Sequence, residues 1–417
     1  MSLSDLLSDF IQHLHSPEFH QLARHPKHPG AFTRQRKLPL PSLVAVMLCG
    51  MSKSVQAELD SFFAHLHQQS QLLRQVSEQA FAQARAKLSH HAIPALNAYL
   101  IDRAEASGWL ARWQGLRLVA ADASKLRFGL RASHTPRAAS ADQIAFGLYL
   151  PGSELMLAAS LHSVHENERQ MLFEHLDRLG PQDLLLLDRG YPCRWLAALL
   201  NQRGIAFCMR VDMGADSGFG CVQRFRRSGL PEQIVTLPKP DRRDVVDYEC
   251  PATAPRVRLV RQVSPSGQVR VLMTNLFDTR RFPAEAFGDL YHQRWRIEVA
   301  FGRLKHRLNL EHVSGLSHQT VRQDFAAKIL CDNLEALITL AAQSEHPIAP
   351  DRRINRAYAH TVLKPLLPAL LLGHSLVHLL RQAMALIVRR TFKHRPGLSK
   401  PRKTRPKSHK HMALKPC

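Results

Sequence analysis

The sequence predicts a mixed α/β protein in which helical regions flank a central sheet. Short apolar segments typical of strands occur between residues 116 and 211, and helical patterns separate the later ones. Apolar residues also recur at helical spacing before residue 112 and after residue 283. The chain has 417 residues, which is enough for two or three domains and a sizeable core.

The first hundred residues have mainly helical patterns. Ser77 is a candidate N-cap for a helix whose exposed side is expected to carry Arg85 and Lys87. Two short helices, the second of them basic, are typical of helix-turn-helix contacts with DNA. An ordinary helical bundle fits the same pattern equally well, so both interpretations stay open.

The predicted sheet begins near residue 116. Three strands follow one another, and Pro151, Gly152 and Ser153 mark the hairpin between the second and the third. A helix is expected over residues 166–179. A wholly apolar strand then ends at Asp188, and a helix closed by Gly204 leads to a further strand.

The second half of the chain changes character twice. Residues 212–282 are rich in Gly, Arg, Asp and Pro, and alternating basic and apolar positions predict a β-hairpin around residues 264–267. A long helix is expected over residues 283–310, with further helices to about residue 390. Residues 389–417 contain no acid and many Lys and Arg, which predicts a basic tail that is disordered alone and orders on DNA; a solvated tail without a specific role is the alternative.

The charge of the chain indicates a polyanionic partner. Its 57 Lys and Arg outnumber its 34 Asp and Glu, which gives a net charge of +23, and nucleic acid is the usual partner of such a protein. No apolar run is long enough to span a membrane, and the N-terminus does not resemble a signal peptide, so we expect a cytoplasmic protein with no membrane partner. The seven scattered cysteines argue against a zinc ribbon and a disulfide scaffold, and no His pair has metal-ligand spacing.

Two acids are predicted at the ends of buried strands. Asp122 follows one apolar strand, and Asp188 ends another. A buried carboxylate is costly unless its charge is compensated, and a hard divalent cation with oxygen ligands would compensate two at one sheet edge. Each acid alone has an equally good structural explanation, because Asp122 could cap a turn and Asp188 could pair with Arg189.

The helix around Glu298 favours the functional interpretation. At about 100° per residue, four polar side chains fall on one stripe of the helix, with Trp295 beside them; they are Tyr291, Arg294, Glu298 and Lys305. Glu298 borders the apolar face, as a third metal ligand would require. An ordinary amphipathic helix would not explain an aromatic residue, two bases and an acid on one stripe.

These residue types predict phosphodiester chemistry. Two Mg²⁺ ions, about 4 Å apart, would activate an oxygen nucleophile and stabilise the leaving oxygen, and Mn²⁺ is the expected substitute. Asp122 would bind both ions, and Asp188 and Glu298 would each bind mainly one. Arg294 and Lys305 would offset phosphate charge without donating protons, because an Arg side chain remains protonated.

These residues resemble the catalytic core of the DDE transposases of bacterial insertion sequences, and in particular the insertion-sequence-four family. The hallmark of that family is Y-x2-R-x3-E-x6-K, which this chain matches completely from Tyr291 to Lys305. The segments around Asp122 and Asp188 resemble those that carry the family's two aspartates, although Ala123 stands where many relatives have Gly. The resemblance covers most of residues 30–330.

The resemblance implies an RNase H-like catalytic core interrupted by a β-rich insertion, with N- and C-terminal helical regions. It also implies metal-dependent cleavage at terminal inverted repeats, cut-and-paste strand transfer into target DNA, and a homodimer in a paired-end complex. Tyr291, Arg294 and Lys305 carry over as contacts to the transposon-end DNA, and we add Trp295 as a base-stacking residue. The expected divisions are a helical DNA-binding region 1–112, a first core part 113–211, the insertion 212–282, the signature helix 283–330, a C-terminal helical region 331–388 and the basic tail 389–417.

Two other functions compete with an active transposase. One is a catalytically silent DNA-binding derivative, such as a repressor of its own element, against which the intact carboxylates and signature argue. The other is a different RNase H-like nuclease, such as a resolvase, which would not require Tyr291, Arg294 and Lys305 on one stripe.

Overall fold

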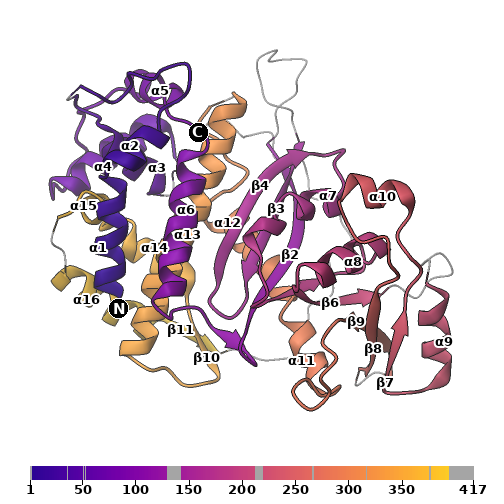
Figure 1. Ribbon diagram of the computed structural model, residues 1–417. Helices are drawn as coiled ribbons and strands as arrows, with labels where there is room; N and C mark the ends of the chain where they lie inside the picture. Colours follow the sequence, from indigo (N-terminus) through magenta and orange to yellow (C-terminus); the bar gives the residue numbers. More distant parts are fainter. Residues whose placement is uncertain are drawn as a thin grey trace.

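A mixed sheet flanked by helices forms one half of the molecule, which confirms the predicted α/β class (Figure 1). The computed structural model describes residues 2–34, 36–49, 51, 53–128, 142–211, 219–264, 267–315, 317–374 and 377–393. Within these residues the strands of the main sheet run in the order β4-β3-β2-β5-β6-β9-β8-β7, and β1 pairs with β2 at one end. The strands are β1 (Arg112–Trp113), β2 (Leu116–Arg127), β3 (Asp142–Leu150), β4 (Leu155–Ser163), β5 (Asp183–Leu187), β6 (Ala206–Val211), β7 (Glu232–Thr236), β8 (Arg256–Val263) and β9 (Val269–Thr274).

The pairing of the strands follows from the connections between them. β2, β3 and β4 form an antiparallel meander, and the turn after Leu150 contains the predicted Pro151 and Gly152. β5 and β6 run parallel to β2, because a helix or a longer connection lies between each pair. β8 and β9 form the predicted hairpin, and β9 pairs with β6, so the strands β7, β8 and β9 extend the same sheet.

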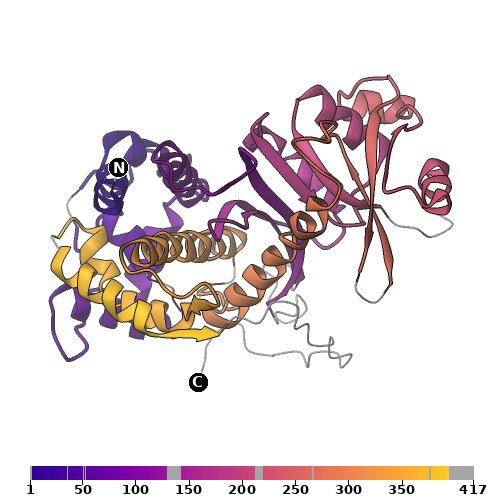
Figure 2. The same ribbon diagram turned by 90° about the horizontal axis from the view of Figure 1, so that it is seen from below.

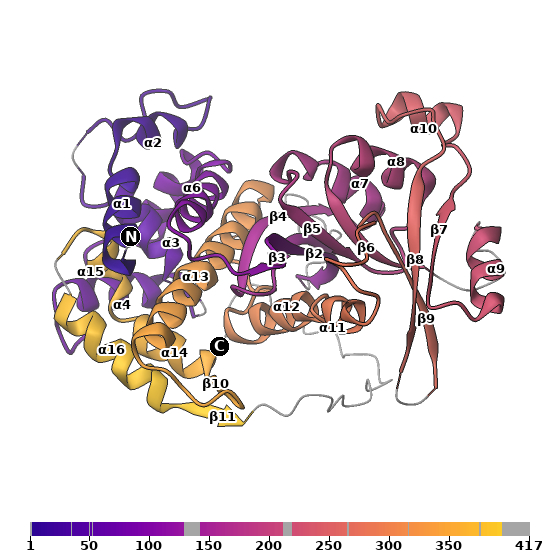
Figure 3. The same ribbon diagram turned by 60° about the horizontal axis from the view of Figure 1, so that its bottom comes forward.

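Helices cover both faces of the sheet (Figure 3). One face carries α7 (Glu168–Phe173) and α8 (Arg194–Gln202), and the other carries α11 (Ala286–His292) and α12 (Trp295–Arg307). Gly204 follows α8 with a φ of 66°, a conformation that glycine adopts without strain, and ends that helix as predicted. The short helices α9 (Gly220–Ser228) and α10 (Arg242–Asp247) lie beside β7–β9.

The other half of the molecule is helical, and it contains helices from both the N-terminal and the C-terminal parts of the chain (Figures 1 and 2). The helix α13 (His318–Glu345) runs through this half and packs against α1, α3, α5, α6, α14 and α16. The remaining elements are α1 (Leu3–Leu14), α2 (Pro17–Leu22), α3 (Leu40–Leu48), α4 (Val55–Leu66), α5 (Glu78–Ala86), α6 (Ala92–Ala106), α14 (Arg356–Leu363), α15 (Leu367–Leu371), α16 (Val377–Arg389) and the strand pair β10 (Arg352–Ile354) and β11 (Thr391–Lys393). Within the part of the chain that the structure describes, no helix is long and apolar enough to cross a membrane.

Two predicted helices are shorter than expected. The helix predicted over residues 166–179 is α7 followed by a 3₁₀ turn, Leu176–Arg178. The helix predicted over residues 283–310 is divided into α11 and α12. At the division the backbone N–H groups of Gln293, Arg294 and Ile297 bond to carbonyls three residues earlier, so the chain turns by about 120° per residue there instead of 100°.

The prediction that Arg85 is exposed is wrong. Ser77 does cap α5, by accepting a hydrogen bond from the N–H of Ala80, but the Arg85 side chain is only 4% exposed. Its guanidinium donates to Asp324 at 2.5 Å and to Gln323 at 2.8 Å, both on α13. The pattern of one helix does not reveal such a partner, because α13 lies more than 200 residues further along the chain. In the predicted basic tail, residues 391–393 form β11, and residues 394–417 lie outside the described residues.

Candidate functional site

The two predicted aspartates lie at one end of the parallel strand pair. The last paired residues of β2 and β5 are Ala120 and Leu186. Asp122 and Asp188 each follow that pair at the second position, so the two carboxylates reach the same region of the sheet. Asp188 comes directly after β5, as predicted.

The prediction that Asp122 ends its strand is wrong. β2 continues to Arg127, because its second half pairs with β3, where Asp122 stands opposite Gly147. Only the parallel pairing with β5 stops before Asp122. Asp122 therefore lies in the interior of a strand and is more constrained than a residue in a loop.

Glu298 reaches this region from α12. Three apolar side chains of α12, Ile297, Phe301 and Leu304, are buried, and α12 packs against β2. The Glu298 side chain is 28% exposed, which agrees with its predicted position at the border of the packed face. Arg294 Nη2 donates to Glu298 Oε1 at 2.9 Å, so an arginine one turn earlier holds this carboxylate.

The carboxylates influence one another electrostatically. Burial raises the pKa of Asp122 to about 7, and the negative charges of Glu298, Glu168 and Asp188 act in the same direction. The positive charge of Arg294 lowers the pKa of Asp122 and offsets only part of this effect. Asp188 and Glu298 therefore both lie within electrostatic range of Asp122.

Glu168, the first residue of α7, is an acid of this cluster that the sequence analysis did not identify. Burial raises the pKa of Glu168, and the charge of Asp188 raises it further. The buried Tyr191 belongs to the same surroundings, because burial and the charges of Glu168, Asp122 and Asp188 all raise its pKa. The sequence signal for Glu168 was its position at a helix start before the second aspartate, which is too common a feature to single out a residue.

The other signature residues divide into buried and exposed groups. Tyr291 and Arg294 are only 6% and 5% exposed, and the guanidinium carbon of Arg294 lies 4.9 Å from the centre of the Trp295 ring. Trp295 is 38% exposed. Lys305 Nζ donates to the backbone carbonyl of Lys125 on β2 at 2.6 Å. Part of the Trp295 side chain is therefore accessible to a partner, whereas the Arg294 guanidinium donates a hydrogen bond to Glu298.

The donor chemistry of the cluster suits hard divalent cations, because it consists of carboxylate oxygens. In the part of the chain that the structure describes, one group of three potential ligands has all of its ligand atoms within 4.8 Å of one another. That group is Cys331, Glu335 and His360, in the helical half, and not the three predicted carboxylates. No sequence motif linked these residues, because His360 belongs to a different helix from the other two.

The chain is similar to a protein-family model, to a protein of known sequence and to a solved structure. Residues 113–334, more than half of the chain, match the family model described as "Transposase DDE domain". The chain is 27% identical over 187 residues to the transposase InsG for insertion sequence element IS4 of Escherichia coli (strain K12), a match that covers 44% of this chain and 40% of that protein. Among solved structures, a piggyBac transposase in a synaptic complex with hairpin DNA shares 12% identity, with a TM-score of 0.43, over 95% of this chain and 84% of that chain.

Proposed function

Because this chain belongs to the transposase DDE domain family and is of the IS4 type, we propose that it is the transposase of an insertion sequence. It cuts double-stranded DNA at terminal inverted repeats and joins the ends to target DNA by a cut-and-paste route. The observation that carries this proposal is the carboxylate cluster on β2, β5 and α12, in which burial and neighbouring charges raise the pKa of Asp122 to about 7.

The catalytic core has an RNase H-like fold in this proposal. The strand order β4-β3-β2-β5-β6, with β2 to β4 antiparallel and with β5 and β6 parallel to β2, supports the assignment. The strands β7, β8 and β9 fall between Asp188 and Glu298 in the sequence, which supports an insertion over residues 212–282. The division into helical ends, core and insertion keeps the boundaries expected from the sequence.

Asp122, Asp188 and Glu298 would hold the divalent cations, Mg²⁺ or Mn²⁺. A cluster of partly buried carboxylates with incompletely offset charge is a suitable environment for such ions. When bound, they would activate an oxygen nucleophile and stabilise the leaving oxygen of the phosphodiester. Asp122 lies in the middle of a paired strand and would provide the most rigid of the three ligands.

The signature residues around the carboxylates would position the reactants. Arg294 holds Glu298 and remains charged throughout, so it acts as a positioning residue and not as an acid. Lys305 is anchored to β2 through the Lys125 carbonyl and would place a positive charge near the bound DNA backbone. Trp295, with its exposed ring, would stack on a base of the transposon end, and Tyr291 would support Arg294 from inside.

The N-terminal helical region would supply further DNA contacts. A groove of about 660 Å³ between α5 and the segment before α3 is lined by four basic side chains, Arg34, Arg36, Lys37 and Lys87. The two arginines and Lys37 are exposed. Such side chains neutralise DNA phosphates, and this electrostatic attraction provides most of the affinity of a protein for DNA of any sequence. A homodimer would hold two transposon ends together.

Incubation of the purified full chain with a donor plasmid, a target plasmid and Mg²⁺ tests the proposal. The donor carries the terminal inverted repeats that flank the gene. We expect cuts at the repeat ends and joined donor–target products. A chain that binds the repeats but releases no cut ends would be the catalytically silent repressor. Metal-dependent cutting of branched DNA without regard to the repeats would indicate a resolvase-like nuclease.

A further inference from the structure

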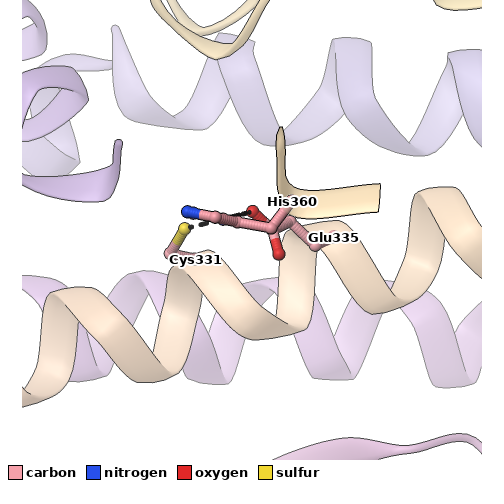
Figure 4. Close-up of side chains that lie close together, drawn as sticks. All are labelled: Cys331, Glu335 and His360. Carbon is pink, nitrogen blue, oxygen red and sulfur yellow. Dashed lines mark hydrogen bonds and ion pairs between the residues drawn. The ribbon is translucent and has the colours of Figure 1, made fainter. Parts of the chain in front are cut away.

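A second cluster of potential metal ligands lies in the helical half of the molecule, away from the carboxylate cluster (Figure 4). Cys331 and Glu335 are one turn apart on α13, so their side chains lie on the same face of that helix. His360 comes from α14, which packs against α13. The ligand atoms of the three residues all lie within 4.8 Å of one another.

The contacts within the cluster converge on one carboxylate oxygen. His360 Nδ1 lies 2.5 Å from Glu335 Oε1, and Cys331 Sγ lies 3.7 Å from the same oxygen. The Cys331 side chain is fully buried, and the side chains of Glu335 and His360 are 3% and 16% exposed. A carboxylate with so little access to water is costly unless its charge is compensated, and a bound cation would provide that compensation.

We propose that Cys331, Glu335 and His360 form a structural binding site for Zn²⁺. A thiolate, an imidazole nitrogen and a carboxylate oxygen are the three ligand types that zinc takes in proteins, whereas Mg²⁺ prefers oxygen ligands alone. The positive charge of the ion would balance the negative charge of the buried Glu335 carboxylate. It would also attach α14 to α13, and hence the C-terminal helices to the helix that runs through the whole helical half.

Two further side chains lie close to the proposed ligands. Cys49 directly follows α3, and its thiol donates to the Ala45 carbonyl of that helix at 3.1 Å. We therefore do not include Cys49 among the proposed ligands. The Thr339 hydroxyl donates to the backbone carbonyl of Glu335, one turn earlier on α13, at 2.6 Å.

Cobalt substitution tests the site independently of DNA cleavage. Co²⁺ bound to a cysteine thiolate gives a charge-transfer absorption band that ions held by carboxylates lack. We expect one equivalent of Co²⁺ to produce this band in the full chain, and Zn²⁺ to abolish it. The Cys331→Ser variant should lose the band, and Glu335→Gln and His360→Asn should weaken Co²⁺ binding more than about tenfold, since even changes outside the ligand set cost about that much.

The control is Cys250→Ser, because Cys250 is a buried free cysteine outside the cluster. This variant should keep the band at full strength. X-ray absorption of the zinc-loaded wild-type chain, which needs no variant to fold, should show one sulfur ligand. A wild-type chain with no thiolate band and no sulfur ligand, or a band that survives Cys331→Ser, would overturn the proposal and leave His360 and Glu335 as an ordinary buried ion pair.

Discussion

Replacement of Asp122 by asparagine should stabilise the metal-free protein at neutral pH while removing a proposed metal ligand. The reason is the raised pKa of Asp122, which means that the folded state resists ionisation of this carboxyl group. Well below its ordinary pKa of 3.8 the group is protonated in both the folded and the unfolded chain, so it has no effect on stability there and only a small effect near pH 4. As pH rises to about 7, the unfolded chain ionises first, and the wild-type protein loses stability that the asparagine variant keeps.

The magnitude follows from the two pKa values. The ordinary value of 3.8 and the value of about 7 in the folded protein differ by about 3 pH units, and each pH unit corresponds to about 1.4 kcal/mol. The upper bound is therefore about 4 kcal/mol. We expect a measured gain of about 2–4 kcal/mol above pH 7, because relaxation of the site lowers the cost of the charge.

Thermal unfolding in the presence of a chelator, followed between pH 4 and pH 8, measures this gain. The melting temperatures of the wild type and Asp122→Asn should coincide near pH 4 and diverge up to about pH 7. Addition of Mg²⁺ at pH 8 should raise the melting temperature of the wild type more than that of the variant. The control is Asp247→Asn, at an exposed helical acid, which should show no divergence. If Asp122→Asn were as unstable as the wild type at pH 8, the account of a charge-crowded site would be refuted.

Three other outcomes follow from the structure. Arg85→Met should cost about 3–5 kcal/mol of unfolding free energy in chemical denaturation, because it removes the arginine that pairs with the buried Asp324. Arg243→Met at an exposed pair should cost less than about 1 kcal/mol; equal losses would contradict the burial argument. Arg36→Gln and Lys37→Gln should each weaken DNA binding for every sequence and reduce the slope of log affinity against log salt by about 1, and an unchanged slope would remove the groove from the DNA path. Trp295→Ala should abolish the 2-aminopurine fluorescence change expected at the transposon end when DNA binds; an unaltered change would exclude base stacking by this residue.

Much of the sheet could be predicted from the sequence, because local patterns determine its strands. The apolar run before Asp188 and the turn residues Pro151 and Gly152 are such patterns, and both predictions are confirmed. The extent of β2 was not predictable in this way. Its polar second half becomes a strand only because β3 pairs with it, so Asp122 lies inside a strand.

The remaining differences concern contacts between distant segments. Arg85 and Cys331 look like ordinary helical residues in the sequence, and their surroundings depend on partners in other helices. The direction of the buried Arg294 guanidinium depends on its contacts with Glu298 and with the rings of Tyr291 and Trp295. The sequence therefore predicted which residue types come together at the candidate site. The packing of distant segments against one another determined which of these residues are exposed.

The most direct test of the central claim is DNA cleavage at the terminal repeats by the wild type and by three single variants, Asp122→Asn, Asp188→Asn and Glu298→Gln, in Mg²⁺. Glu285→Gln, at an exposed glutamate just before α11, is the matched control. Each of the three variants should bind the repeats as tightly as the wild type but cut them at least about a hundredfold more slowly, since each would remove one of the proposed ligands of the divalent cations. The control should cut normally. Undiminished cutting by any of the three variants would contradict the claim that these carboxylates form one catalytic site.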